Sequence, residues 1–320
     1  MGSVWVDMRR SLVLGLLGPI LVVGAAGRLL AVGEAPSFSA SPIDSGISVP
    51  VLREEGTEEM ALDNYLRHVL LGEMPASFEP EALKAQAVAA RTYTLRALTT
   101  GGKHDGALCT DSACCQAYCA QEVYESQPPE TLEKIRLAVS ETDGLVLSYE
   151  GALIEATFFS GSGGRTEDAV AVWGVDYPYL RAVDSPGETG SPHDRDNFYF
   201  TRQTLEHILG ISLEEGCFLG EASFTSGGGV ERLTLGEHSF SGVYLRRALG
   251  LPSTAFTATV EGDGLRFDTR GYGHRVGLSQ YGANAMAARG SSFREILSHY
   301  YTGTTLLNYG EFVEKRNEIW

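Results

Sequence analysis

Positive charge is scarce in this sequence. Lysine and arginine together supply 25 of the 320 residues, against 41 aspartates and glutamates, so the formal net charge is −16. Proteins that hold a nucleic-acid backbone gain affinity by neutralising phosphates and releasing their counterions, which requires basic residues. Nucleic acid is therefore not an expected partner.

Compositional bias is also missing. Hydrophobic residues make up 43% of the chain and charged residues 21%, which is ordinary for a folded protein and excludes a disordered, collagen-like or polytopic membrane protein. No internal repeat is visible. A chain of this length forms one large domain or two small ones.

Long apolar runs are absent except near the amino terminus. Residues 11–27 carry no charge and follow Arg9 and Arg10. Such a run reaches the lower limit for crossing a bilayer, and the basic residues before it keep the amino end in the cytoplasm. A cleavable signal peptide fits the same segment, so both interpretations stay open. We expect a cytoplasmic stub and single membrane pass over 1–32, a Ser-, Pro-, Ala- and Gly-rich tether over 33–50, and an extracytoplasmic domain over 51–320.

Cysteine is rare outside one short segment. Four of the five cysteines lie between Cys109 and Cys119, just after His104. Disulfide geometry disfavours a bond between the adjacent Cys114 and Cys115. His104, Cys109 and Cys115 offer the imidazole and thiolates that a tetrahedral zinc ion binds, with water, Cys114 or Cys119 as the fourth ligand. We expect one zinc ion, structural rather than catalytic. Disulfides that include Cys114 or Cys119, and free thiols, remain alternatives.

Helical signals occur at both ends of the exported part, and strand signals lie between them. Apolar spacing predicts a helix over 63–71, and Pro80 opens a second, alanine-rich helix that runs to a Gly-Gly pair at 101–102. A capping box at 292–295 begins a helix near the carboxyl end. Strands are predicted at 145–149, 153–160, 232–235, 257–260 and 265–269. This order favours an α+β fold, one large mixed domain after the amino-terminal transmembrane helix.

Six sequence blocks between residues 62 and 307 stand out. They are Gly-Glu-Met-Pro at 72–75, Glu-Ala-Leu-Lys-Ala-Gln-Ala-Val-Ala-Ala-Arg-Thr-Tyr at 81–93, Cys-Gln-Ala-Tyr at 115–118, Phe-Phe-Ser-Gly-Ser-Gly-Gly-Arg-Thr-Glu at 158–167, Tyr-Pro-Tyr-Leu at 177–180 and Gly-Tyr-Gly-His-Arg-Val-Gly-Leu-Ser-Gln-Tyr-Gly-Ala at 271–283. In this order they resemble the stage II sporulation protein D family and the related amidase-enhancer proteins. Arg275 departs from the pattern, because the family commonly has glycine there.

The resemblance implies a lytic transglycosylase that cleaves peptidoglycan glycan strands between N-acetylmuramic acid and N-acetylglucosamine, preferably strands stripped of stem peptides. Glu73 is then the catalytic acid. A protonated Glu donates to the glycosidic oxygen, and the carboxylate then takes the proton of the muramic acid 6-hydroxyl, which closes onto C1 as a 1,6-anhydro ring. Such an acid needs a raised pKa, hence an apolar pocket without a neighbouring cation.

The resemblance also implies a cellular setting. The protein would act in septal thinning and engulfment during sporulation, in the septum or forespore intermembrane space. Its expected partners are the glycan strands, a cell-wall amidase that strips stem peptides, and a membrane anchor protein of the engulfment machinery.

Further site residues are expected in three blocks. The resemblance assigns substrate contacts to Lys84, Gln86 and Arg91, where a cation suits the lactyl carboxylate of a stripped strand. Ser160 and Ser162 belong to a glycine-rich turn that we expect to line the groove, since the turn lacks the glycine spacing of a serine nucleophile elbow. In the last block, hydrogen bonds to sugar groups are expected from His274, Ser279, Gln280 and Tyr281.

Two other functions remain open. One is a glycan-binding module that stimulates a cell-wall amidase without cutting the glycan. The other is a zinc hydrolase that acts through His104, Cys109 and Cys115. The products formed from purified stripped strands distinguish these functions from lytic transglycosylation.

Overall fold

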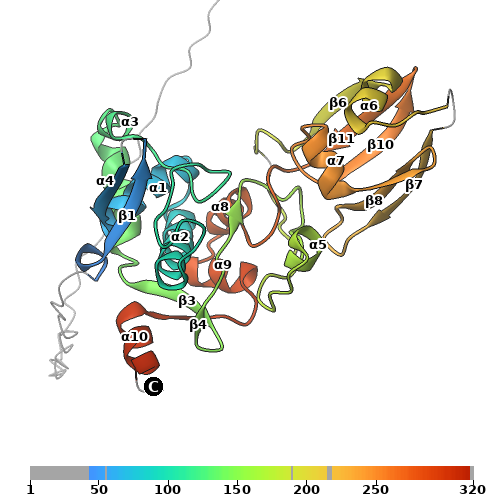
Figure 1. Ribbon diagram of the computed structural model, residues 1–320. Helices are drawn as coiled ribbons and strands as arrows, with labels where there is room; N and C mark the ends of the chain where they lie inside the picture. The colour runs from blue at the N-terminus through green and yellow to red at the C-terminus, as the bar shows by residue number, and fades with distance from the viewer. Residues whose placement is uncertain (1–42, 55, 189, 215–217, 318–320) are drawn as a thin grey trace, which may run out of the picture. The chain divides into compact units, whose positions relative to one another are not determined.

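The computed structural model describes residues 43–54, 56–188, 190–214 and 218–317 (Figure 1). None of the helices within these ranges is long and apolar enough to span a membrane. The predicted membrane segment and most of the predicted tether lie outside the described residues. The fold begins before residue 51, because the short 3₁₀ helix Asp44–Gly46 starts with a fully buried side chain.

The first of two hydrophobic cores surrounds helix α2 (Pro80–Thr100). Its alanines at 82, 85, 87, 89 and 90 are buried and let neighbouring elements approach closely. α2 packs against α1 (Leu62–Glu73), α4 (Pro129–Ser140), α8 (Gln280–Ala288), α9 (Phe293–Tyr300) and β3 (Leu145–Tyr149). The two helices predicted after residue 62 are confirmed. α9 begins with the predicted capping box, in which the side chains and backbone amides of Ser292 and Glu295 bond reciprocally.

Short strands and helices complete this core. β13 (Thr305–Asn308) and β4 (Ala152–Leu153) flank β3 in an antiparallel sheet, and β1 (Ser48–Arg53) pairs with β2 (Gly56–Ala61). The single strand predicted over 153–160 is wrong. The segment divides into β4 and β5 (Phe158–Phe159), because β4 pairs with β3 whereas β5 pairs in parallel with β12 (Leu278–Ser279). Three further helices lie outside the second core: α3 (Gln121–Glu125), α5 (Ala169–Trp173) and α10 (Tyr309–Asn317).

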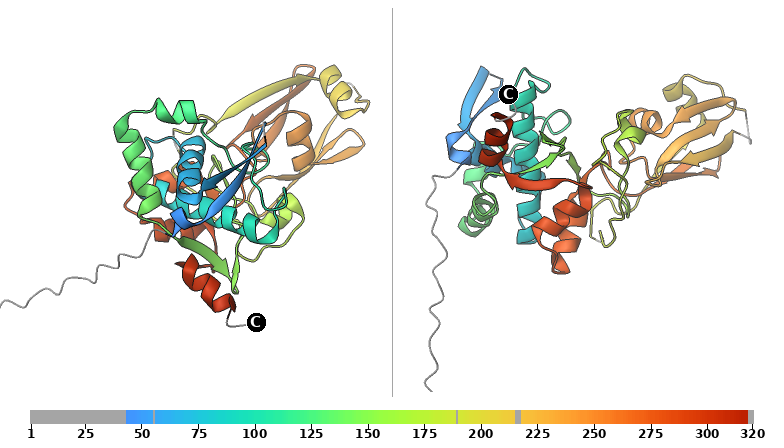
Figure 2. Two further views of the ribbon diagram at one scale, coloured as in Figure 1. Left: turned by 60° about the vertical axis from the view of Figure 1, so that its left-hand side comes forward. Right: turned by 90° about the horizontal axis from the view of Figure 1, so that it is seen from below.

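The second core lies within residues 196–269, drawn yellow to orange in Figure 2. One antiparallel sheet has the order β10 (Phe256–Glu261), β11 (Gly264–Thr269), β6 (Asp196–Thr201), and a second has the order β7 (Leu219–Phe224), β8 (Val230–Leu235), β9 (His238–Ser241). α6 (Arg202–Leu209) and α7 (Gly242–Ala248) pack against these strands. Helices therefore interrupt the strand-rich middle of the chain. The predicted mixed α+β class is nevertheless confirmed.

Candidate active site

A cavity of about 870 Å³ forms where segments distant in the sequence meet. This volume is within the range of small-ligand sites, about 300–1,000 Å³. Its walls come from the end of α1, the loop after α2, β5, α5 and the start of α8. Its described lining includes acidic, basic, aromatic and amide side chains: Glu73, Lys103, Glu155, Trp173, His193, Tyr272, His274, Gln280 and Tyr281.

Glu73 is the last residue of α1 and reaches the cavity wall. Its Oε1 accepts a hydrogen bond from the Ala117 backbone N–H at 2.5 Å, and its Oε2 accepts one from Gln280 Nε2 at 3.1 Å. Burial raises the pKa of Glu73, and these two bonds, which favour the carboxylate, offset only part of the rise. No Lys or Arg of the described chain forms an ion pair with it. The carboxyl therefore has the environment that an acid working near neutral pH requires.

Gly72 permits this arrangement. A Cβ at this position would lie 2.9 Å from the backbone nitrogen of Cys119 and 3.0 Å from that of Tyr118. Only glycine leaves room for the 117–119 segment to lie directly against the end of α1. This close approach positions the Ala117 N–H on the carboxyl of the next residue, Glu73.

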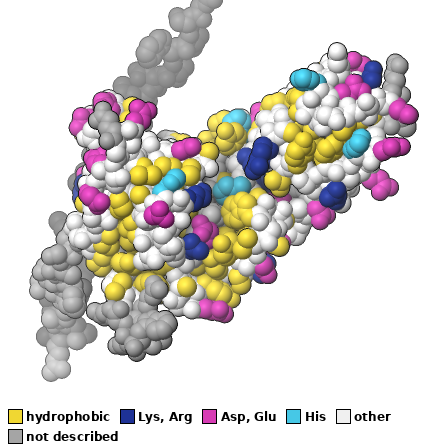
Figure 3. Space-filling model, viewed as in Figure 1, with side chains coloured by type: hydrophobic (Ala, Val, Ile, Leu, Met, Phe, Trp, Pro, Cys, Tyr) yellow, Lys and Arg dark blue, Asp and Glu magenta, His cyan; other side chains and the backbone are white. Residues whose placement is uncertain are grey.

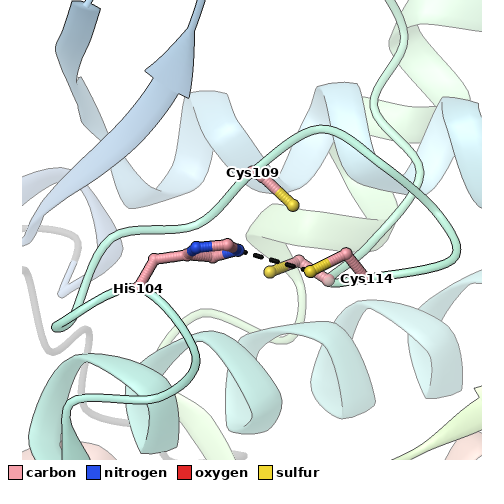
Figure 4. Close-up of side chains that lie close together, drawn as sticks. His104, Cys109 and Cys114 are labelled. Atoms are coloured by element: carbon pink, nitrogen blue, oxygen red, sulfur yellow. Dashed lines mark hydrogen bonds between the residues drawn. The ribbon is translucent and has the colours of Figure 1, made fainter.

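The loop between α2 and residue 117 brings its predicted metal ligands together. One donor atom each from His104, Cys109, Cys114 and Cys115 lies within 4.8 Å of the others, and His104 Nε2 is 3.3 Å from Cys114 Sγ (Figure 4). Zn–S bonds of about 2.3 Å and Zn–N bonds of about 2.0 Å in a tetrahedron place ligand atoms about 3.5–4 Å apart. The donor set therefore fits a zinc ion after small adjustments, and Cys114 would be the fourth protein ligand.

Cys119 lies apart from this cluster. Its side chain is buried, and its thiol donates to the Ala120 carbonyl. The four described cysteines have no disulfide between them. Cys119 is therefore a core residue in this arrangement, and of the two cysteines considered as a fourth ligand only Cys114 lies with the other donors.

The three α2 residues expected to contact substrate do not line the cavity. Lys84 Nζ pairs with Glu81 at 2.8 Å and with Glu141 at 2.6 Å. Gln86 and Arg91 are completely buried. In this arrangement neither buried side chain is accessible to a glycan strand, and Lys84 links elements of the fold.

The serines of the glycine-rich turn have different surroundings. Ser160 lines the cavity, and its carbonyl accepts the Tyr281 N–H at 3.0 Å. Ser162 is fully buried and bonds to Glu188. Ser279 caps α8 by accepting the Gly282 N–H, but it is buried as well. Of these three serines, only Ser160 is placed to meet a ligand.

His274, Gln280 and Tyr281 all line the cavity. Burial, together with the charge of Arg246, lowers the pKa of His274 to about 4, so its ring is neutral at physiological pH. Its Nδ1 accepts the Val276 N–H at 3.1 Å, which assigns the proton to Nε2. Gln280 contacts Glu73 directly, so it positions the carboxyl as well as facing the cavity.

Comparison with known proteins agrees with this geometry. The family model described as "Stage II sporulation protein" matches residues 53–149, which include Glu73 and the His/Cys loop. Stage II sporulation protein D of Bacillus subtilis is 38% identical over 291 residues, covering 88% of this chain and 84% of that protein. The chain belongs to the stage II sporulation protein D family. The protein of the same name from Bacillus amyloliquefaciens is 36% identical over the same shares of both chains.

A more distant relative has a different printed name. The "Amidase enhancer" of Bacillus subtilis is 29% identical over 302 residues, covering 76% of this chain but 40% of that longer protein. The similarity therefore covers less than half of the amidase enhancer.

The departure from the family pattern at Arg275 has a structural explanation. Its backbone φ is +67°, the left-handed conformation that glycine adopts without strain. The buried guanidinium pairs with Glu167 at 3.0 Å and donates to the carbonyls of Ser162, Arg165 and Gly227. These contacts offset a backbone cost of about 1–3 kcal/mol. The loop keeps the conformation that glycine favours.

Sequence reasoning missed several residues of the site. Glu188 is a buried carboxylate that accepts bonds from two backbone amides and three serine hydroxyls, and no local motif marks it. His193 stacks on Tyr272 with ring centroids 4.4 Å apart, and both line the cavity. Lys103, which precedes the predicted zinc ligand His104, also lines the cavity. The position of Lys103 next to the His/Cys loop is the one sequence signal that pointed to any of these residues.

Proposed function

We propose that the protein is a lytic transglycosylase that cleaves peptidoglycan glycan strands in a sporulation-related cell-wall process. The observation that carries this proposal is the Glu73 carboxyl: it lies on the wall of a large cavity, burial raises its pKa, and its partners are an amide and a backbone N–H. Membership of the stage II sporulation protein D family supports the cell-wall setting.

The chemistry needs one carboxyl in two protonation states. Protonated Glu73 donates to the glycosidic oxygen between N-acetylmuramic acid and N-acetylglucosamine as the C1–O bond breaks. The resulting carboxylate takes the proton of the muramic acid 6-hydroxyl, whose oxygen bonds to C1 and forms the 1,6-anhydro ring. Gln280 and the Ala117 N–H hold the carboxylate during this exchange. No water is consumed.

A hydrolytic mechanism would require a second carboxyl, as base or nucleophile. Apart from Glu73, the described cavity lining contains one carboxylate, Glu155. It is engaged by Arg96, with 2.8 Å between Arg96 Nη1 and Glu155 Oε2. An ion-paired carboxylate is a poor base, so the site favours the single-carboxyl reaction.

The decisive experiment is Glu73→Gln. On purified stripped strands we expect wild-type protein to release 1,6-anhydro ends, detected by mass spectrometry, and the variant to lose about 10²–10⁴-fold in rate. Glu79→Gln, an exposed residue before α2 and outside the cavity, is the matched control and keeps the rate. Hydrolysed ends, or an unchanged yield from Glu73→Gln, would refute the proposal.

The pH dependence follows from the raised pKa of Glu73. Because the protonated form starts the reaction, the rate should fall as the pH rises through that pKa. Folding stability changes in the same range: a carboxyl whose pKa is higher in the folded state costs stability once it ionises. At pH 8 Glu73→Gln should therefore melt at the same or a higher temperature than wild type, and this difference should vanish in acid.

We also propose one structural zinc ion held by His104, Cys109, Cys114 and Cys115. Zinc would cross-link the ends of a loop that leads to Ala117, and so hold the N–H that contacts Glu73. No step of the reaction passes through the ion. A zinc hydrolase is less favoured, since four protein donors leave no open position for water.

The cellular arrangement is part of the proposal. We infer that residues 11–27 attach the protein to the cell membrane with the folded part on the extracytoplasmic side. Its partners there would be a cell-wall amidase and a membrane anchor protein of the engulfment machinery. Fractionation of cells, followed by protease accessibility of the folded part, tests this orientation.

A non-catalytic role is the second candidate, favoured by the similarity to the Bacillus subtilis amidase enhancer. A glycan-binding enhancer would bind strands and raise the rate of an amidase, and Glu73→Gln would leave both effects unchanged. The product assay separates the two functions, because an enhancer forms no new glycan ends.

A further inference from the structure

The cavity contains one lysine or arginine among its described lining residues, and this is Lys103. It follows the left-handed Gly101 that ends α2. Its Nζ donates to the Cys114 carbonyl, and no carboxylate of the described chain lies within ion-pair distance of it. An ammonium group has three donors. Two of them are free for a ligand in the cavity.

Glu155 and His193, which also line the cavity, each have a partner. Glu155 pairs with Arg96, and His193 Nδ1 lies 2.7 Å from Asp196 Oδ2. Glu73 has a raised pKa, which favours its neutral form. On the face shown in Figure 3, acidic side chains are scattered rather than gathered into one patch. Lys103 is therefore the one Lys or Arg side chain of the described lining and has no carboxylate partner, and it favours an anionic group on the ligand.

Lys103 and Glu73 contact the same short segment of the chain, between residues 114 and 117. Lys103 contacts the Cys114 carbonyl, and Glu73 contacts the Ala117 nitrogen. The chain between these two backbone atoms spans at most about 10 Å even when fully extended. With a hydrogen bond of about 3 Å at each end, the ammonium and carboxyl groups lie less than about 16 Å apart. Both line the same cavity, so one disaccharide unit of a strand is long enough to reach both.

We propose that Lys103 binds the lactyl carboxylate of the N-acetylmuramic acid residue whose C1 reacts at Glu73. This subsite rests on the proposed function. A stem peptide converts that carboxylate into a bulky amide, so only a stripped strand offers the lactyl carboxylate itself to the ammonium group. Lys103 would thus select stripped strands. Because Lys103 is exposed, the preference should be about three- to tenfold.

Binding is best measured without turnover, in the Glu73→Gln background. The ligands are stripped glycan strands and the same strands with their lactyl carboxylates converted to methylamides. We expect the parent to bind the free-acid strands about three- to tenfold more tightly. Adding Lys103→Met should abolish that preference and Lys103→Arg should keep it. Arg136→Met, which removes an exposed charge outside the cavity, should also keep it.

Several outcomes would overturn the subsite. One is a preference that persists in the Lys103→Met protein. Another is an equal loss of affinity for both strands together with a loss of bound zinc, which would assign Lys103 to the loop alone. Absence of any glycan binding by the parent would overturn the proposed function and the subsite together. Selective binding by a protein that forms no anhydro ends in its wild-type form would keep the subsite and overturn only the catalytic proposal.

Discussion

Arg91 tests whether the arginine in the middle of α2 stabilises the fold or binds substrate. The resemblance suggests a substrate contact, whereas the structure buries Arg91 completely against Asp44, with Nη2 and Oδ2 2.7 Å apart. Arg91 Nη2 and Nη1 also donate to the carbonyls of Val139 and Leu145, at 3.1 and 3.3 Å. The guanidinium thus ties the first turn of the described chain to the end of α4 and the start of β3.

Removing the cation by Arg91→Met leaves the Asp44 carboxylate buried and unpaired. Breaking a buried ion pair in this way costs about 3–5 kcal/mol. For a protein of this size each kcal/mol lowers the melting temperature by about 2–4 °C, so we expect a fall of roughly 6–20 °C. Replacing both partners, as in Asp44→Leu with Arg91→Met, should restore much of this stability, because no buried charge remains.

The pH dependence of the melting temperature separates the effect of an unpaired Asp44 carboxylate from a loss of packing. Burial raises the pKa of Asp44, and the charge of Arg91 counters that rise. Without Arg91 the pKa rises further, and a carboxyl with a raised folded pKa costs stability only above the pH at which it ionises. The deficit of Arg91→Met should therefore be largest near neutral pH and shrink as the pH falls toward 4.

Calorimetry of wild type, Arg91→Met and the double variant from pH 4 to 8 measures these effects. Glycan binding by each protein, tested well below its melting temperature, completes the comparison. A single variant that keeps its melting temperature and loses glycan affinity would refute the structural assignment and support the substrate contact instead.

Two further predictions concern the supports of the site. Removing zinc with a strong chelator, or changing Cys115→Ser, should release about one zinc per chain and lower the melting temperature; a protein that never holds zinc, or whose melting is unaffected by its loss, contradicts the structural metal site. Glu188→Ala leaves buried donors of Ser162, Gly163, Ser185 and Ser279 unsatisfied, at about 1–3 kcal/mol for each one that finds no water. Its urea midpoint should fall markedly, and a midpoint equal to that of wild type would show that these bonds are dispensable.

Local chemistry determined the elements that carry the site. Apolar spacing and Pro80 sufficed for α1 and α2, because helix periodicity and first-turn proline act within a few residues. The grouping of His104 with Cys109 and Cys115 was also visible, since all three lie on one short loop. The predicted helix over 63–71 ends two residues before Glu73, where α1 ends.

Only the tertiary structure decided what surrounds these residues. Gln280 meets Glu73 across 207 positions of sequence, and Asp44 meets Arg91 across 47. No local rule encodes such pairs, because they depend on packing between segments that are distant in the sequence. The same packing turned Arg91 and Gln86 inward, and it left Lys103, which has no motif of its own, as the positive charge in the cavity. The sequence determined which groups are available for chemistry, and the fold decided which of them face the cavity, because exposure depends on contacts between distant segments.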